Sequence, residues 1–279
     1  MVQMSIQTNI SLKNLCEHSI RKYDFADQAI IFMEASNVSL EIFKQLSNIF
    51  STLDHVDKIK KGVFKKAIIF EDFRLMQNLM KIDFDIHQSY EFDVKSIHYA
   101  SAKNKVNSIN FLLQNGADIN AVDFINRTPL HIAAMNVNLE AVEFLLKKNA
   151  NVDVKDLLNN TVLHYLFKAA LNFPKDLDRI TEITILLISN KIKTDVVNSV
   201  EKETAINLAV KYKLYNTLEA ILKLKKSIID ECNGDGETPL FIAAMENDIQ
   251  SFKMLLQYGA NPYVKSKNQV SAFDFIKTD

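Results

Sequence analysis

The sequence is poor in turn residues, with only 5 glycines and 4 prolines among 279 residues, and it contains no tryptophan. An all-β fold needs many turns, so this scarcity favours a mostly helical chain. Hydrophobic residues make up 48% of the sequence, which is enough to bury a large core. The two cysteines, Cys16 and Cys232, are too few for a disulfide framework and favour a reducing compartment.

The sequence also lacks an excess of charge of either sign. Its 33 Lys and Arg residues nearly balance 34 Asp and Glu residues, so neither nucleic acid nor an anionic membrane is an expected partner. No apolar run approaches the roughly 18 residues that a membrane span needs, and the N-terminus lacks the pattern of a secretory signal. These absences predict a cytoplasmic protein, or one in a host cytosol if it is a secreted effector.

Motifs that carry catalytic chemistry are missing as well. The sequence has no HExxH, GxSxG or CxxC motif. The stretch from Glu231 onward resembles a calcium loop at its first six positions, but the twelfth position, which should be a bidentate glutamate, is Ile242. We therefore expect no catalytic residue, no metal and no cofactor.

One seven-residue motif occurs twice in the chain with a single difference. Residues 128–134 read "TPLHIAA" and residues 238–244 read "TPLFIAA". Steps of 33 residues from Thr128 reach the related phrases "KSIH" at 95–98 and "TVLH" at 161–164. A fixed period of this length predicts a stack of helical units.

Each unit contains the signals of two consecutive helices. Thr128 occupies the position of a helix N-cap, and Pro129 follows at the first helical position, where its missing N–H costs nothing. An apolar stripe over residues 139–146 predicts the second helix. Residues that favour a left-handed conformation follow the second helices and predict their ends. These predicted caps are Gly116, Asn149 and Gly259.

These patterns carry a resemblance to a known family. The stretches "INFLLQNGADINAVD" (109–123) and "RTPLHIAAMNVNLEAVEFLLKKNANVDVKD" (127–156) resemble the ankyrin repeat, whose unit is a β-turn finger and two antiparallel helices. The resemblance implies an all-α solenoid with about six units and a partial seventh over residues 57–279. Residues 1–56 are predicted to form a helical N-terminal region that acts as a degenerate capping repeat.

The fourth unit departs from the period. Its pair of large apolar residues, Leu186 and Leu187, arrives eight residues late, so an insertion is predicted near residues 169–179. Pro174 would break a continuous helix, and we expect the insertion to lengthen the loop between the two helices of the unit. It is either a tolerated surface insertion or a partner-specific loop.

The finger tips are apolar where ankyrin repeats usually have polar residues and a glycine. Strict periodicity places Phe92, Ile125 and Leu158 in one row, with Phe124 beside Leu157. Such a cluster predicts a partner surface, unless the side chains fold back onto neighbouring fingers. The predicted partner-binding residues are Phe92, Phe124, Ile125, Leu157 and Leu158 at the tips, and Met135, Asn136 and Asn138 near the first helix of the central unit.

Three histidines, His98, His131 and His164, recur at the same period. Successive units place them too far apart to share one metal, whose bonds to nitrogen are near 2 Å. The resemblance implies instead that each histidine ties neighbouring fingers together by hydrogen bonds.

A second resemblance lies near the N-terminus. In "SLKNLCEHSIRKY" (11–23), Leu12, Cys16 and Ile20 share one helical face and resemble the BC box of SOCS-box proteins. The resemblance implies docking on elongin C, with Leu12 as the main pocket residue and Cys16 and Ile20 beside it. A plain core-facing stripe is the alternative interpretation.

The leading functional hypothesis is a monomeric, non-enzymatic scaffold that binds one or more proteins through the concave face of its fingers and first helices. Three alternatives remain open. The chain could be the substrate-recognition subunit of an elongin–cullin ubiquitin ligase, a host-directed effector of an intracellular bacterium or virus, or an enzyme with an embedded site.

Overall fold

The structure is a computed structural model that describes residues 56–81 and 84–278. The chain forms two compact units, which meet in sequence between Asp85 and Ile86 and are described separately below. The segment that resembles a BC box, residues 11–23, and nearly all of the predicted capping region lie outside the described residues.

The described part of the first unit is a pair of helices, α4 (Val56–Phe70) and α5 (Phe73–Met80). The side chain of Asp72 begins α5 by accepting a hydrogen bond from the Leu75 N–H at 2.9 Å. Phe64 stacks on Phe84 with ring centroids 4.2 Å apart, and both side chains are buried.

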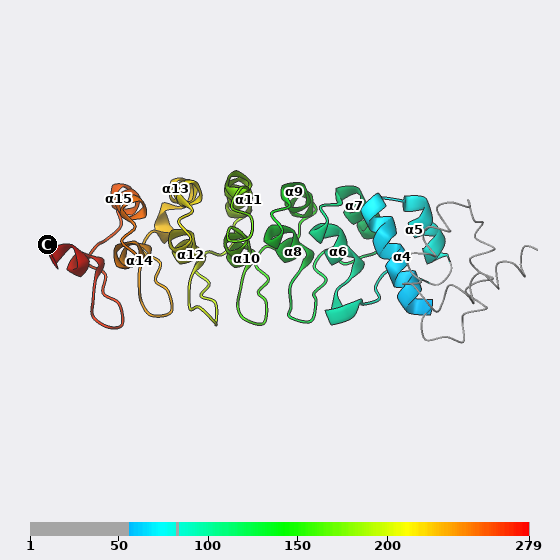
Figure 1. Ribbon diagram of the computed structural model, residues 1–279, viewed down its shortest axis with the longest axis horizontal. Coiled ribbons are helices and arrows are strands. Elements are labelled where there is room, and N and C mark those ends of the chain that lie inside the picture. Colours follow the sequence, from blue (N-terminus) through cyan, green and yellow to red (C-terminus); the bar gives the residue numbers. More distant parts are fainter. Residues whose placement is uncertain (1–55, 82–83, 279) are drawn as a thin grey trace, which may run out of the picture. The chain divides into compact units, whose positions relative to one another are not determined.

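The second unit is a stack of short helix pairs. Figure 1 shows the first helices of the pairs in one row, the second helices in another, and long loops extending from the first row. The first helices are α6 (Ser96–Ala102), α8 (Pro129–Met135), α10 (Val162–Ala169), α12 (Ala205–Lys211) and α14 (Pro239–Met245). The second helices are α7 (Val106–Gln114), α9 (Leu139–Lys147), α11 (Leu177–Ser189), α13 (Tyr215–Leu224) and α15 (Ile249–Tyr258). Short 3₁₀ turns occur at η1 (Glu91–Asp93), η2 (Lys226–Ile228) and η3 (Ala272–Thr278).

The core lies between successive pairs, because α6, α8, α10, α12 and α14 pack on one another in that order. Leu130 and Leu163 are fully buried there, and so are the small residues Ala133 and Ala134, which allow α8 to approach its neighbours closely. The described helices are all α or 3₁₀, which confirms the predicted all-α repeat stack.

The predicted helix ends are confirmed. The Thr128 hydroxyl accepts from the His131 N–H at 3.4 Å, and the Thr238 hydroxyl accepts from the Phe241 N–H at 3.1 Å. After the second helices the backbone is left-handed at the three predicted positions. The φ angles there are 92° at Gly116, 62° at Asn149 and 93° at Gly259.

Thr238→Ala should show what one cap contributes. The alanine leaves the Phe241 N–H without its side-chain acceptor, and we expect the free energy of unfolding to fall by about 1 kcal/mol. Urea unfolding followed by circular dichroism measures the change. Thr238→Ser retains the hydroxyl and should stay close to wild type; equal losses in the two variants would show that the cap is not the cause.

The fourth unit, in which an insertion near residues 169–179 was predicted, differs from the others in both its loop and its second helix. Residues 170–176 join α10 to α11, whereas residues 136–138 suffice between α8 and α9. The remaining insertion lengthens α11, which has 13 residues against 9 in α9. The helix accommodates the extra residues because Ile180, Ile183 and Leu187 extend its apolar stripe and are all fully buried.

Candidate protein-binding surface

The loops that join successive pairs are hairpin-like fingers. In the finger of residues 123–127, the Asp123 N–H donates to the Arg127 carbonyl at 3.0 Å, and Asn126 at the tip has a φ of 70°. Asparagine tolerates this left-handed conformation better than most residues, so it replaces the glycine usual at this position. In the next finger, Asn159 has the same role with a φ of 59°.

Four of the five predicted tip residues are exposed: Phe92 (68%), Phe124 (53%), Leu157 (69%) and Leu158 (47%). Ile125 is partly buried. We call these five residues the apolar tip row. The alternative interpretation was that these side chains fold back onto neighbouring fingers. Most of the row does not do so.

Neighbouring fingers pair with an offset of one residue, which differs from the arrangement that strict periodicity predicted. The Phe124 N–H donates to the Phe92 carbonyl at 3.1 Å, and the Leu157 N–H donates to the Ile125 carbonyl at 3.0 Å. The Phe92 ring also packs on the Phe124 ring, with ring centroids 5.2 Å apart. Backbone hydrogen bonds between tips therefore hold the row in place.

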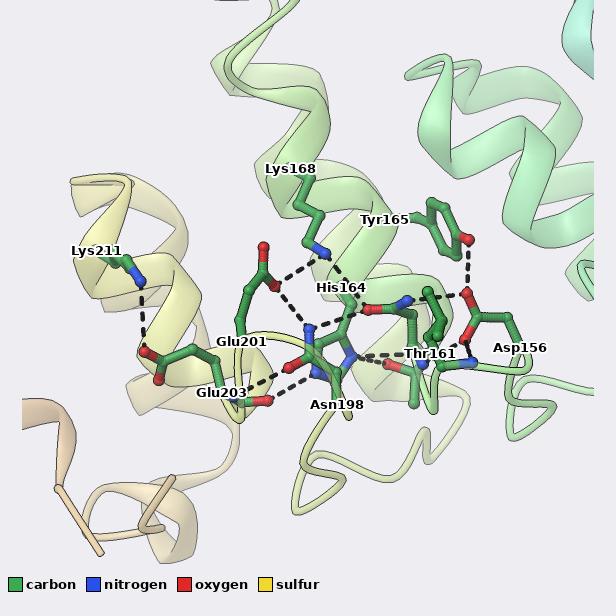
Figure 2. Close-up of polar contacts among 11 residues, drawn as sticks. Asp156, Thr161, His164, Tyr165, Lys168, Asn198, Glu201, Glu203 and Lys211 are labelled. Atoms are coloured by element: carbon green, nitrogen blue, oxygen red, sulfur yellow. Dashed lines mark hydrogen bonds and ion pairs between the residues drawn. The ribbon is translucent and has the colours of Figure 1, made fainter. Parts of the chain in front are cut away.

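Asp156 is the hub of the polar contacts at the base of its finger (Figure 2). Its Oδ1 accepts from the N–H groups of Leu158 at 2.8 Å and Asn160 at 2.7 Å. Its Oδ2 accepts from the Asn160 side chain at 2.9 Å and the Tyr165 hydroxyl at 2.7 Å. Burial alone would raise the pKa of the Asp156 carboxyl, but the hydrogen bonds from Asn160 and Tyr165 outweigh it and lower the pKa.

The polar contacts continue into the next finger. Asn198 donates to the Asn160 side-chain oxygen at 3.0 Å and to Glu201 Oε2 at 2.7 Å. Lys168, near the end of α10, forms an ion pair with the same Glu201 oxygen at 2.9 Å (Figure 2). These contacts join α10 to the finger that follows it, so the fingers and the first helices form one polar framework.

Two further cations lie where fingers meet first helices. Arg127 forms an ion pair with Asp123 at 2.7 Å, and Lys211 at the end of α12 lies 3.6 Å from Glu203. We call Arg127, Lys168 and Lys211 the cationic row. Burial raises the pKa of the Glu203 carboxyl, although the hydrogen bond from Asn233 and the Lys211 charge oppose the shift.

A family model described as "Ankyrin repeats (3 copies)" matches residues 64–156, 97–176 and 166–266, which together cover more than half of the chain. The chain belongs to the ankyrin-repeat family. The match leaves out residues 11–23 and gives no support to the BC box predicted there. No curated protein matched the chain.

Solved structures share this ankyrin-repeat fold. The ankyrin repeat domain of human ASB11 is 22% identical, with a TM-score of 0.62 over 76% of this chain and 90% of that chain. The ankyrin repeat domain of Bcl-3, a member of the IkappaB protein family, is 15% identical, with a TM-score of 0.66 over 76% and 92%. These two likenesses show the fold alone.

A third similar chain comes from a complex of two proteins, the predatory endopeptidase Bd0816 from Bdellovibrio bacteriovorus and the immunity protein Bd3460. It is 27% identical to this ankyrin-repeat chain, with a TM-score of 0.55 over 68% of this chain and 92% of that chain.

Two of the three recurring histidines form the hydrogen bonds between fingers that the resemblance implied. His98 Nε2 bonds the Arg127 carbonyl at 2.9 Å, and His164 Nε2 bonds the Glu203 carbonyl at 3.1 Å, each in the following finger. His131 Nε2 makes no hydrogen bond of good geometry within the described residues, although the Asn160 backbone of the following finger lies close enough to interact with its ring. Burial lowers the pKa of His131 to about 4, so its ring is neutral near pH 7.

The other predicted contact residues lie away from the tips. Met135 is partly buried at the end of α8, where its sulfur accepts a weak 3.9 Å hydrogen bond from Arg127. Asn136 donates to the Ile132 carbonyl at 2.8 Å, and Asn138 donates to the Ser101 carbonyl of the preceding unit at 2.8 Å. Both amides are therefore engaged in the scaffold, at the opposite end of α8 from the finger.

Sequence reasoning missed the cationic row. Lys168 and Lys211 occupy the same position of their units, seven residues after Thr161 and Thr204, so the period itself could have revealed them. Arg127 could not be found in this way because it lies in a finger and has no equivalent cation in the next finger.

No group of three or more His, Cys, Asp or Glu side chains within residues 56–81 and 84–278 could hold a metal ion. No helix in this part of the chain is long and apolar enough to cross a membrane.

One carboxyl outside the two rows should make stability depend on pH. Burial raises the pKa of Glu231 to about 7, and Oε2 of its carboxyl has no hydrogen-bond partner among the described residues. The folded chain therefore binds a proton that the unfolded chain has released. The contribution of this proton to the free energy of unfolding is fully present below pH 4.5, the ordinary pKa of a glutamate. It is lost as the pH rises through 7, the pKa in the folded chain.

We expect Glu231→Gln to be more stable than wild type at pH 8 by about 1–2 kcal/mol, a figure reduced for the partial exposure of the carboxyl, and similar to it at pH 4.5. Urea unfolding at the two pH values measures the difference. Glu182→Gln, at an exposed position on α11, is the matched control. If the difference in free energy of unfolding between Glu231→Gln and wild type is the same at both pH values, the pH dependence does not come from Glu231.

Proposed function

We propose that this ankyrin-repeat protein is a non-enzymatic interaction module that binds a partner protein through its apolar tip row. The observation that carries the proposal is the exposure of Phe92, Phe124, Leu157 and Leu158 on neighbouring fingers. Large apolar side chains grouped on a surface lose unfavourable contact with water when a partner covers them.

The rigidity of the row supports the same proposal. The tips are joined by backbone hydrogen bonds, and the carboxylates of Asp123 and Asp156 bind the backbone N–H groups of their own fingers. A surface held in its binding conformation loses little conformational entropy when a partner docks. Ankyrin repeats are typically non-catalytic protein-binding modules, and one of the similar chains comes from a complex of two proteins.

We place Met135 at the margin of the proposed surface because it contacts Arg127. We leave Asn136 and Asn138 outside it, because their amides bind backbone carbonyls at the other end of α8.

Site-specific photo-crosslinking in cells tests where a partner binds. A benzophenone amino acid replaces Phe92 in one variant and Ile249, an exposed residue at the start of the second helix α15, in the other. We expect a discrete crosslinked species from the Phe92 variant and none from the Ile249 variant. A crosslink from Ile249 alone would move the binding surface to the second helices and overturn the proposal.

A further inference from the structure

We infer that the segment of the partner that docks here carries carboxylates beside large apolar side chains, with the carboxylates bound by the cationic row and the apolar groups by the tip row. This inference rests on the proposed function and adds the chemistry of the partner to it. The inference is based on which member of each ion pair, the cation or the carboxylate, is more exposed to solvent.

In two of the three ion pairs of the cationic row the cation is the more exposed member, and in the third pair Lys168 (31%) and Glu201 (29%) are about equally exposed. The side chains of Arg127 and Lys211 are 20% and 42% exposed, whereas those of their partners, Asp123 and Glu203, are 0% and 8% exposed. A molecule approaching these fingers therefore meets positive charge first, although each pair is formally neutral. Such an oriented pair attracts an anion at short range.

Arg127 keeps hydrogen-bonding capacity for a ligand. Its Nε and Nη2 both bind Asp123 Oδ2, while Nη1 reaches only the sulfur of Met135 at 3.9 Å. A thioether is a weak acceptor, so a carboxylate from a partner would be a much better one.

The inward carboxylates are already satisfied and do not favour a cationic partner. Asp123 Oδ1 accepts from the N–H groups of Ile125 and Arg127, and both oxygens of Asp156 have two donors each. Glu201 is partly exposed, but its Oε2 accepts from both Lys168 and Asn198. A cationic segment would have to displace these contacts, whereas an acidic segment would not.

The two rows are adjacent: Arg127 shares the finger of Phe124 and Ile125, and the finger that Lys168 and Lys211 contact is bonded to the tip of Leu158, whose carbonyl accepts from the Ser199 N–H at 2.8 Å. Ile125 at the tip and Arg127 at the base are two residues apart, and Lys168 binds the finger that follows Leu158. Lys168 pairs with Glu201 at 2.9 Å and Lys211 lies 3.6 Å from Glu203, so the two lysines contact the same finger. One partner segment can therefore contact both rows. The acidic residues at the first tip, Glu91 and Asp93, limit the positive region on that side.

A random peptide library displayed on phage and panned on the full chain tests the inference. We expect the enriched peptides to carry large apolar residues and an excess of Asp and Glu over Lys and Arg. The affinity of one enriched peptide is then measured for wild type and for Lys168→Gln with Glu201→Gln. This double substitution removes a cation without leaving a carboxylate unpaired, and we expect binding about tenfold weaker.

Glu143→Gln with Lys147→Gln is the matched control, because it removes an exposed pair of opposite charges from the second helix α9 and should leave the affinity unchanged. Enriched peptides that depend on Phe124 but show no acidic excess would overturn this inference and leave the proposed function standing. Peptides that bind Phe124→Asp as well as wild type would overturn both. A single-stranded oligonucleotide that binds through Lys168 as tightly as the peptide would also overturn the inference, in favour of a nucleic-acid ligand.

Discussion

Replacing Asp156 with alanine is expected to lower the free energy of unfolding by about 2–4 kcal/mol. The substitution removes the acceptor for two backbone N–H groups, for the Asn160 side chain and for the Tyr165 hydroxyl. Asp156 is 5% exposed, so water cannot readily replace the lost carboxylate. Urea unfolding followed by circular dichroism measures the change.

Asp156→Asn is the informative control. Asparagine already occupies the equivalent position of a later finger, where Asn233 accepts from the N–H groups of Asp235 and Glu237 at 2.9 Å each. Asp156→Asn should therefore retain the two backbone contacts and lose less than half as much stability as Asp156→Ala. If the two substitutions lower the free energy of unfolding equally, the contribution of Asp156 comes from its negative charge and not from the hydrogen bonds that its side chain accepts.

The site of unfolding is a further check on the Asp156→Ala result. Because each repeat contacts only its neighbours, a local loss of stability should appear near the altered finger first. Hydrogen exchange is expected to increase in α10 and in the finger of residues 156–160 before it increases in α14 and α15.

The features that were predictable from the sequence depend on residues close together in the chain. The caps at Thr128 and Gly116 were predicted because a side chain that accepts an early N–H, or a residue that tolerates a left-handed backbone, acts locally. The exposed apolar tips were predicted for a similar reason, since a tip residue stands out against a regular repeat.

The features that were not predictable depend on how neighbouring units meet. The contact of Phe92 with Phe124 accompanies the one-residue offset between fingers, which a strict 33-residue period does not contain. The ion pair of Lys168 with Glu201 spans the insertion, so no fixed spacing indicates it. The insertion was predicted from the period, but the division of the extra residues between loop and helix depends on the packing of Ile180 and Ile183.

The second large effect concerns binding rather than stability. Phe124→Asp combined with Leu157→Asp is expected to weaken partner binding by at least about 100-fold, because two charges would be buried in an apolar interface. Phe124 and Leu157 are exposed in the free chain, so the same substitutions should leave the melting temperature close to that of wild type.

Leu224→Asp with Ile249→Asp is the matched control for this variant. Both residues are exposed on second helices, and the substitution adds the same two charges away from the fingers. We expect this control to bind the partner with the affinity of wild type.

The central claim, that the apolar tip row binds the partner and is not part of the core, is tested most directly by measuring both properties of Phe124→Asp with Leu157→Asp. A partner is first purified on the wild-type chain, and its affinity for the variant and the variant's melting temperature are then measured on the same preparation. The account predicts a loss of binding with an unchanged melting temperature. A partner that binds as tightly as before, or a melting temperature lowered by many degrees, would contradict it.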